Sequence, residues 1–521
     1  MPDARSIVLA LLAVALPVPD ACAVESRAAL DAAQAHVREH QREILREFIE
    51  LLAIPNVASD TANIGRNARH IVGMLEDRGI DARLLEVEGG PPVVYGELPA
   101  AGADVTLMVY VHYDGQPVQA ESWASEPWTP VLRDGRLEDG ASLVELDVHE
   151  GPLDPDWRLY ARSAGDDKAP IVAVAHALDA LETAKVPRAV NLKFFFEGEE
   201  EAGSPHLSAM LQRHADLLAA DLWLFCDGPR HQSGRPQLAF GVRGVSGLDI
   251  TLFGPAYDVH SGHYGNWAPN PAAMLAHLLA SMRDPEGHVL IEGFYDDVVP
   301  PSAAERAAIE AAPPVDAVLM EELALGSAEG GGQRLEERLL EPALNVKGLS
   351  AGAVGAAARN AIPASATTSL GLRLVPDLTP RKARELLEAH VRAQGYHIVR
   401  RPPDMKTRRA HERVAQLSWS ESGYPAVRTA MDSPQALALI AVMREAVGEE
   451  LVLMPTMGGS LPLYLIRERL DAPVVILPVA NHDNNQHAAD ENLRLGNLFE
   501  AVEIYAAVFA GFDMGATRAR H

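Results

Sequence analysis

The sequence predicts an α/β protein whose main domain is interrupted by a smaller α+β domain. At 521 residues the chain is too long for a single hydrophobic core. Apolar strands alternate with helices before residue 240, and the same alternation resumes after about residue 426. Such alternation is typical of a sheet covered by helices. We therefore expect one domain built from residues 24–240 and 427–521, with residues 241–426 inserted as a second domain.

The elements of the first domain follow from short apolar runs and longer helical patterns. Its strands are expected at 106–111, 159–160, 192–196, 222–226, 451–455 and 473–478. Its helices are expected at 171–184, 205–218, 434–447 and 489–512. Because the strand segments are strongly apolar, we expect them in the interior of a layered α/β domain.

The inserted segment predicts the β-α-β-β-α-β order of a ferredoxin-like sandwich. Its strands are expected at 247–253, 369–375 and 396–400, and its helices at 271–282 and 381–394. Residues 296–332 lie between the two halves and are rich in Pro, Ala, Glu and Gly. We expect this segment to form a helical arm with a mobile turn.

Residues 1–23 have the pattern of a secretory signal peptide. A positively charged residue precedes the apolar stretch 7–18, and small residues offer a cleavage site after Ala23. A buried N-terminal helix is one alternative, and a lipid anchor at Cys22 is another. The sequence thus predicts a periplasmic or secreted protein, in which Cys226 would be the only remaining cysteine and no disulfide could form.

The charge of the chain restricts its partners. A formal net charge of −27 argues against nucleic acid and anionic membrane surfaces. The apolar stretch near the N-terminus is too short for a comfortable membrane span. We therefore expect a small-molecule substrate.

Adjacent carboxylates follow the predicted strand 192–196, where Glu200 and Glu201 lie in a glutamate-rich run. Open α/β sheets bind their ligands at the carboxyl ends of their strands. One carboxylate of such a pair could hold a metal while the other takes a proton from water. A solvated acidic run is the simpler explanation for an isolated cluster of this kind.

Other predicted strands also lead to possible metal ligands: His112, a carboxylate in the turn 166–168, Asp227 and His487. Asp114 follows His112 and could accept a hydrogen bond from its second ring nitrogen. A single histidine or aspartate at a strand end is more often a turn or cap residue. Five such strand ends, with mixed histidine and carboxylate, are difficult to explain by capping, and together they predict a metal site.

In order and spacing these motifs resemble those of the dinuclear zinc peptidases, a family that includes carnosinase, the cytosolic non-specific dipeptidase, glutamate carboxypeptidase, aminoacylase and succinyl-diaminopimelate desuccinylase. The matching motifs are His-Tyr-Asp at 112–114, Asp-Asp-Lys at 166–168, the Glu200-Glu201 pair, Asp227 and Asn-Gln-His at 485–487. The resemblance spans nearly the whole mature chain. It implies a phosphorylase/hydrolase-like mixed-sheet catalytic domain with an inserted ferredoxin-like lid and dimerisation domain.

The resemblance also implies two metal sites that share Asp166, namely His112-Asp166-Asp227 and Asp166-Glu201-His487. Glu200 would act as the general base, and Asp114 would complete the catalytic set beside His112. A shared carboxylate suits two ions that lower the pKa of a bridging water. Mixed nitrogen and oxygen ligands favour zinc, although manganese or cobalt would also accept them.

Three further parts of the sequence resemble substrate-contacting motifs of the family. His260 matches the lid histidine that reaches the active site of the neighbouring subunit and stabilises the oxyanion, which implies a homodimer. Arg373 would bind the terminal carboxylate of the substrate. Gly459 and Ser460 would approach the same anion, and Asn345 is a weaker candidate for the cleft. A structural loop histidine, a solvated arginine and an ordinary turn are the simpler interpretations.

The sequence therefore predicts an exported two-metal hydrolase that cleaves the amide bond of a dipeptide or small peptide with a free C-terminal carboxylate. An N-acyl-amino-acid deacylase is one alternative, and a periplasmic binding protein without catalysis is another. The second should have lost Glu200 or a ligand, yet none is missing. Residues 138–156 are acidic and longer than the usual connection, and we expect them to form a surface excursion near the mouth of the site.

Overall fold

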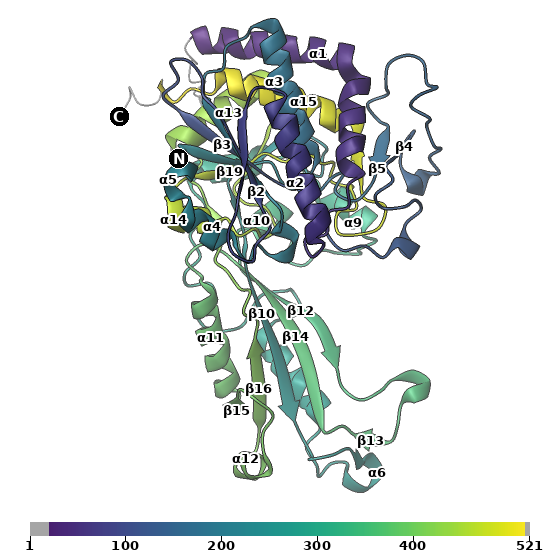
Figure 1. Cartoon of the computed structure of the whole chain (residues 1–521). Helices are drawn as coiled ribbons and strands as arrows, with labels where there is room; N and C mark the ends of the chain where they lie inside the picture. Colours follow the sequence, from purple (N-terminus) through teal and green to yellow (C-terminus); the bar gives the residue numbers. More distant parts are fainter. Residues whose placement is uncertain (1–19, 516–521) are drawn as a thin grey trace, which may run out of the picture.

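The computed structural model describes residues 20–515, with side chains from residue 25 onward. A layered domain holds both ends of this range, and an elongated domain projects from it (Figure 1). Residues 1–19 of the predicted signal peptide lie outside the described residues, and the predicted cleavage point after Ala23 falls inside helix α1 (Asp20–Leu52). Within the described range, none of the helices is both long and apolar enough to span a bilayer.

The first domain is built on a mixed sheet of eight strands. Their order across the sheet is β1 (Asp81–Leu85), β2 (Val93–Leu98), β6 (Asn191–Glu197), β3 (Thr106–His112), β7 (Leu222–Phe225), β19 (Val474–Ile476), β8 (Gln237–Ala239) and β18 (Val452–Met454). The four strands β6, β3, β7 and β19 run parallel to one another, whereas β1, β2 and β6 pair in antiparallel fashion. This mixed sheet confirms the predicted α/β class.

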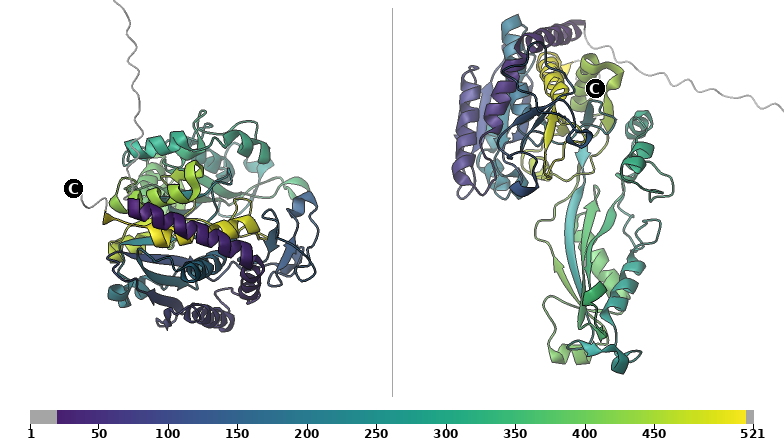
Figure 2. Two further views of the ribbon diagram at one scale, coloured as in Figure 1. Left: turned by 90° about the horizontal axis from the view of Figure 1, so that it is seen from above. Right: turned by 90° about the vertical axis from the view of Figure 1, so that its right-hand side faces the viewer.

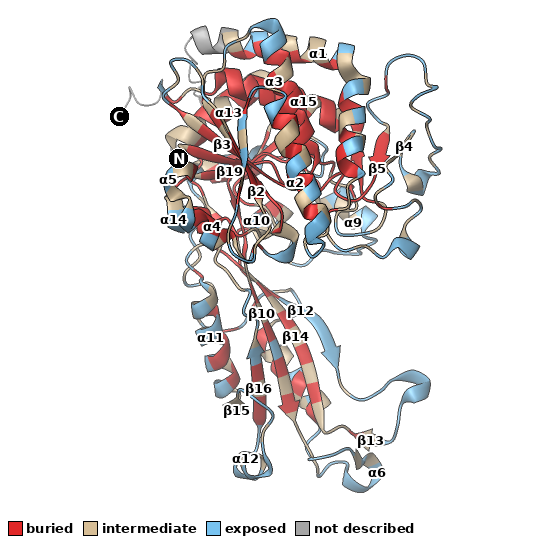
Figure 3. Ribbon diagram, in the orientation of Figure 1, coloured by how far each residue is buried: buried red, intermediate tan, exposed pale blue. Residues whose placement is uncertain are grey.

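Alternate side chains of the central strands pack into two cores, one on each face of the sheet. Phe194 and Phe196 lie in the larger core, which is covered by α1, α2 (Thr61–Glu76), α3 (Ala169–Ala184), α13 (Pro434–Val447) and α15 (Leu495–Gly511). Phe195 lies in the smaller core, covered by α4 (Leu207–Arg213), α5 (Ala215–Leu218) and α14 (Tyr464–Leu470). Figure 2 shows α1 and α15 side by side over the first face, and Figure 3 shows that the covering helices are buried where they contact the sheet.

The inserted domain has the topology of a ferredoxin-like sandwich with one additional strand. Its sheet has the order β12 (Ala343–Ser350), β14 (Ser365–Leu374), β10 (Gly244–Phe253), β16 (Val414–Trp419) and β15 (His397–Val399). Helices α7 (Pro271–Met282) and α11 (Pro380–Ala393) pack on its buried face. Alternate residues of β10 and β14 are buried, so only one face of this sheet is covered.

The fourth strand of this sandwich is not the one that the sequence predicted. The predicted strand at 396–400 forms the edge strand β15, which runs parallel to β16. It is β16 that pairs with β10 and completes the β-α-β-β-α-β order. β16 buries Val414, Ala415 and Leu417 but is interrupted by polar side chains, and the prediction did not include it.

Shorter elements complete both domains. A separate sheet of three strands contains β20 (Asn492–Arg494), β5 (Arg158–Tyr160) and β4 (Val131–Arg133). Two further sheets have two strands each. One pairs β11 (Val259–His260) with β13 (Ala361–Ile362), and the other pairs β9 (Gly241–Val242) with β17 (Val427–Arg428). The remaining α-helices of the described range are α6 (Ser261–Tyr264), α8 (Ala303–Ala311), α9 (Asp316–Glu322), α10 (Leu335–Arg338) and α12 (Met405–Ala410). The chain enters and leaves the inserted domain at β9 and β17, beside the predicted boundaries 241 and 426.

Two predicted helices have different bounds in the structure. The helix expected at 205–218 is divided into α4 and α5 at His214, whose backbone is not helical. The helix expected at 489–512 begins only at Leu495, because Asn492–Arg494 pairs with β5 as strand β20. Leu493 is fully buried in that strand, and burial alone does not distinguish a strand from a helix end.

The helical arm is present as predicted, whereas the acidic excursion lies in a different place from the one expected. The arm at 296–332 contains α8 and α9, and α8 packs against strand β18 of the first domain. The acidic segment 138–156 lies against α1, where the guanidinium of Arg42 donates hydrogen bonds to the carbonyls of Leu146, His149 and Gly151. Contact with this cation holds the excursion on the outer helical layer.

Candidate metal centre

The predicted ligands converge because three parallel strands end at the same edge of the sheet. β3 ends at His112, β7 ends two residues before Asp227, and β6 leads into the turn that holds Glu201. Asp166 comes from the turn that follows β5, and His487 comes from the loop that follows β19. The structure therefore brings all five predicted ligands to one place.

Two groups of candidate ligands share Asp166. They are His112-Asp166-Asp227 and Asp166-Glu201-His487, and within each group the ligand atoms lie within 4.8 Å of one another. Oδ1 of Asp166 is 2.9 Å from Nε2 of His112, and its Oδ2 is 3.1 Å from Nε2 of His487. Since the two oxygens face different groups, Asp166 has the position of a bridging carboxylate.

The other distances fit the same arrangement. Nε2 of His487 lies 3.2 Å from Oε2 of Glu201, and Nε2 of His112 lies 3.9 Å from Oδ1 of Asp227. Each histidine thus faces Asp166 and one further carboxylate, so each group offers one imidazole and two carboxylates.

The burial and charge of the cluster indicate a binding site for divalent cations, independently of any resemblance to other proteins. His112, Asp166 and Asp227 are each less than 5 % exposed, and Oδ2 of Asp227 is buried without a hydrogen-bond partner. In the protein alone, burial and neighbouring carboxylates raise the pKa of Asp227 to about 7, although His112 opposes this. Unpaired buried carboxylates are unfavourable, and divalent cations would neutralise them. Imidazole and carboxylate ligands suit zinc, manganese or cobalt.

Asp114 supports the centre in two ways. Its carboxylate accepts hydrogen bonds from the backbone N–H groups of Glu200 and Glu201, both at 3.0 Å. Its Oδ1 also lies 3.5 Å from Nδ1 of His112, on the side of the ring opposite the ligand nitrogen. The backbone carbonyl of Asp114 lies closer to the same nitrogen, at 3.2 Å, so the hydrogen bond that the sequence suggested is formed with the main chain of Asp114. The contact with the acidic turn was not foreseen.

Glu200 belongs to neither ligand group, although it is next to Glu201 in the chain. It lines the same cavity as the ligands. Burial, Asp227 and Glu201 raise its pKa well above the usual value, against the opposing charge of His112. A carboxylate beside a metal cluster but outside its ligand set is suited to accept and return a proton.

Glu491 holds the turn that presents Asp166, and it was not predicted as a site residue. The buried carboxylate of Glu491 accepts hydrogen bonds from the backbone N–H groups of Ser163, Gly165 and Asp166, at 3.0, 2.9 and 2.8 Å. Its charge is balanced by Arg162, whose Nη1 lies 2.6 Å from Oε2. The only feature of the sequence that could have identified Glu491 is that it is an acidic residue close to the predicted ligand His487.

Two glutamines that bind ligand carboxylates were also not predicted as site residues. Nε2 of Gln116 donates to Oε2 of Glu201 at 2.8 Å. Nε2 of Gln486 donates to Oδ2 of Asp166 at 3.3 Å. Both are close in sequence to predicted motifs, and this proximity was the signal that could have identified them.

A cavity of about 640 Å³ extends from the metal cluster toward the inserted domain. Its lining includes the four candidate ligands Asp166, Glu201, Asp227 and His487, and also Arg373, Gly459 and Ser460. Arg373 lies at the end of β14 nearest the first domain, and its Nη1 donates a hydrogen bond to Oγ of Ser460. The structure thus places three residues predicted as substrate contacts in the same cavity as the candidate ligands.

Two parts of the chain that were expected near the cavity do not line it in a single chain. Asn345 is exposed on the edge strand β12 opposite Gly371, and it does not line the cavity. The acidic segment 138–156 contributes no lining residue either, because it lies against α1. The excursion was placed near the mouth of the site because it connects two motifs in the sequence, and such a position does not determine where a loop lies.

His260 lies at the far end of the inserted domain from the metal cluster. It ends strand β11, next to α6, which Figure 1 shows at the tip of the projecting domain. Its side chain is exposed, and its Nδ1 accepts a hydrogen bond from the N–H of Gly262 at 3.1 Å. His260 does not reach the cavity of its own chain, and its predicted role in a neighbouring subunit stays a prediction.

Comparison with known proteins gives consistent matches over most of the chain. The model of peptidase family M20/M25/M40 matches residues 108–510. The Cys-Gly metallodipeptidase of Schizosaccharomyces pombe is 25% identical over 425 residues, which cover 80% of this chain and 81% of the relative. Human Beta-Ala-His dipeptidase is 26% identical over 431 residues, covering 80% and 77%. The structure of an M20 family metallo-carboxypeptidase from Sulfolobus solfataricus superposes with a TM-score of 0.71 at 27% identity, covering 90% of this chain and 99% of that one.

Proposed function

This chain belongs to peptidase family M20/M25/M40, whose members are metal-dependent hydrolases of peptide bonds, and we propose that it is a dinuclear zinc dipeptidase. The proposed substrates are dipeptides or other small peptides with a free C-terminal carboxylate. Manganese and cobalt are compatible with the same ligands.

The observation that supports this proposal best is that Arg373 and the candidate ligands line the same cavity. A guanidinium binds a carboxylate through two parallel hydrogen bonds, which fixes the orientation of the bound molecule. A substrate whose terminal carboxylate contacts Arg373 would extend its amide bond toward Asp166 and Glu200. The limited volume of the cavity favours a small peptide.

Different residues of the site would have different roles in the proposed hydrolysis. Two bound divalent ions would activate water and polarise the amide carbonyl. His112, Asp166, Asp227, Glu201 and His487 would hold those ions. Glu200 would take the proton from the attacking water and return it to the leaving amine. Asp114 would keep the turn that holds Glu200 in place, since it binds the backbone N–H of that residue.

Two further parts of the proposal concern the environment of the enzyme. The signal-like residues 1–23 support export to the periplasm or the medium. The exposed His260, far from its own cavity, supports a homodimer in which it stabilises the oxyanion in the site of the partner. The net charge of −27 favours neither nucleic acid nor an anionic membrane as a partner.

A substrate screen tests the proposed function. The purified enzyme would be incubated with zinc, manganese or cobalt and with Cys-Gly, β-Ala-His and Ala-Ala, which include the dipeptides named for its relatives. C-terminally amidated dipeptides and N-acetyl amino acids would serve as matched comparisons. We expect free dipeptides to be cleaved at least about 100-fold more efficiently than their amides, because only the free acids can bind Arg373. Preferred cleavage of N-acetyl amino acids would instead identify a deacylase.

A further inference from the structure

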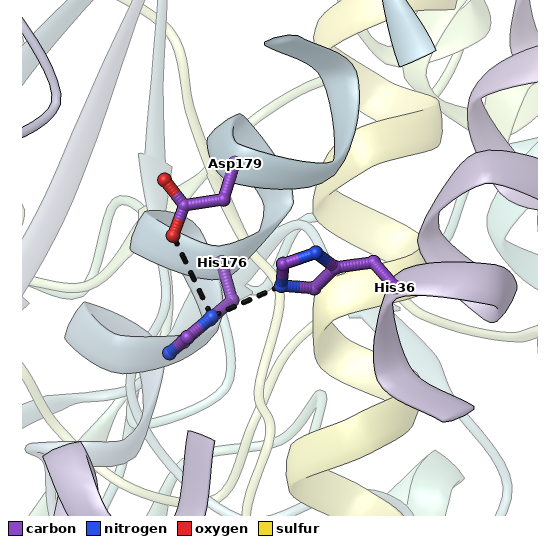
Figure 4. A group of neighbouring side chains, drawn as sticks. All are labelled: His36, His176 and Asp179. Atoms are coloured by element: carbon purple, nitrogen blue, oxygen red, sulfur yellow. Dashed lines mark hydrogen bonds and ion pairs between the residues drawn. The ribbon is translucent and has the colours of Figure 1, made fainter. Parts of the chain in front are cut away.

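A second group of possible metal ligands lies between helices α1 and α3. Figure 4 shows the ring of His36, from α1, directed toward His176 and Asp179, which are one turn apart on α3. One ligand atom from each residue lies within 4.8 Å of the other two. We propose that these three residues bind a structural divalent ion of the zinc class, which fastens α1 to α3.

The spacing of the ligand atoms fits coordination to one ion. Nε2 of His36 is 3.1 Å from Nδ1 of His176, and Nδ1 of His176 is 3.5 Å from Oδ2 of Asp179. Bonds of about 2.0–2.1 Å in tetrahedral geometry separate two ligand atoms by about 3.3 Å. The observed distances lie on either side of that value, so small side-chain shifts would complete the site, with solvent as the fourth ligand.

The other nitrogen of His176 lies close to a carboxylate, although the orientation of the ring in the structure does not form a hydrogen bond with it. Its Nε2 lies 2.8 Å from Oε2 of Glu47, and the histidine side chain is only 3% exposed. Glu47 is itself fixed by Arg78, whose Nη1 and Nη2 lie 3.0 and 2.9 Å from its two oxygens. A proton on Nε2 toward this carboxylate leaves the lone pair of Nδ1 directed at His36 and Asp179.

The charge of the group also suits a dication. Asp179 and Glu47 each contribute one negative charge. Arg78 contributes one positive charge, and its Nε donates to both oxygens of Asp179, at 3.1 and 3.0 Å. A divalent ion would therefore meet a net negative group. The alternative occupant of the gap between the two rings is a single shared proton.

This site is separate from the catalytic cluster. His176 lies seven residues into α3, which begins at Ala169, and a rise of about 1.5 Å per residue places it about 10 Å along the helix from the turn that presents Asp166. None of the three residues lines the catalytic cavity. His36 shares one face of α1 with Glu47, eleven residues away, because three helical turns bring such residues into line. An ion here would hold the first described helix against the domain core.

Zinc binding to matched variants tests the proposal. The purified protein would be stripped with a chelator and dialysed against a series of buffered zinc concentrations, and zinc per chain would be measured by mass spectrometry. We expect His36→Gln and Asp179→Asn each to bind one ion fewer per chain than the wild type. His277→Gln, which changes an exposed histidine on α7, should bind as many ions as the wild type.

Two additional measurements distinguish the loss of this zinc site from unfolding of the variant protein. The His36→Gln protein should retain dipeptide hydrolysis, since His36 contacts no residue of the catalytic cavity, and this shows that the variant is folded. Glu47→Gln should weaken zinc binding at this site about 10-fold to 100-fold without removing a ligand. Equal zinc content in the wild type and His36→Gln at every zinc concentration would overturn the proposal and leave the shared proton as the occupant. This difference does not depend on how many ions the catalytic cluster binds.

Discussion

Glu491 and Arg162 form a buried ion pair behind the metal centre, with 2.6 Å between Oε2 and Nη1 and with side chains that are 0% and 3% exposed. The two residues are 329 positions apart in the sequence. Because Glu491 also binds the backbone N–H of Asp166, this pair connects the C-terminal loop to the turn that holds Asp166. The position of Asp166 thus depends on a pair that does not line the cavity.

Replacing Arg162 by Met should destabilise the fold strongly. The change leaves the buried carboxyl group of Glu491 without its cationic partner, and loss of one member of a buried ion pair typically costs about 3–5 kcal/mol. Urea denaturation in the presence of a chelator measures this effect without any contribution from bound metal. Arg46→Met is the matched control, because Arg46 pairs with Asp147 at side-chain exposures of 58% and 87% and should contribute at most about 1 kcal/mol. Equal losses in both variants would contradict the importance of the buried pair.

Glu200→Gln and Glu201→Gln should have opposite phenotypes. Glu200→Gln keeps the shape of the side chain but removes the base. We therefore expect kcat to fall by about 100-fold to 10,000-fold while the metal content of the protein stays unchanged. Glu201→Gln removes a ligand charge and should lose metal during dialysis. Steady-state kinetics and metal analysis of the two proteins provide the comparison. If the two phenotypes were exchanged, the roles of the neighbouring glutamates would have to be exchanged as well.

Arg373→Met should impair catalysis only for substrates that have a free carboxylate. We expect kcat/KM for a free dipeptide to fall about 100-fold, since a charge-assisted contact worth about 3 kcal/mol is lost. The amide of the same dipeptide should be nearly unaffected. Arg384→Met, which alters a partly exposed ion pair with Glu388 in the same domain, is the control. An equal fall for acid and amide would show that Arg373 acts on the structure of the cavity and does not bind the carboxylate.

Mixed dimers test the proposed role of His260. His260→Ala should lower kcat by about 100-fold to 1,000-fold, the usual effect of losing an oxyanion donor. Co-expression of His260→Ala with Glu200→Gln should restore part of the activity, because one site of each mixed dimer has both groups intact. Purified mixed dimers without any recovery would show that His260 does not act across the subunit boundary.

The sequence was sufficient to predict the layered sheet and the position of the ligand cluster. His112, Asp227 and the Glu200-Glu201 pair follow long apolar strands, and parallel strands end at one edge whatever the details of the loops. β16 was missed because Val414–Trp419 is short and only partly apolar, so the neighbouring predicted strand took its place in the topology.

Residues that support the centre from a distance could not be predicted in the same way. Glu491 acts on backbone N–H groups more than 320 positions away, and no local pattern encodes such a contact. The exposed direction of Asn345 depends on its register with β14, which only the folded sheet defines. Sequence patterns determine which strands are buried, whereas these contacts depend on how distant loops meet.

Metal content measured together with activity tests the central claim most directly. In His36→Gln protein, which lacks the proposed site between α1 and α3, we expect about two divalent ions per chain at the catalytic cluster. Removal of these ions by a chelator should abolish dipeptide hydrolysis, and zinc, manganese or cobalt should restore it. A preparation that is free of metal and fully active would contradict the account.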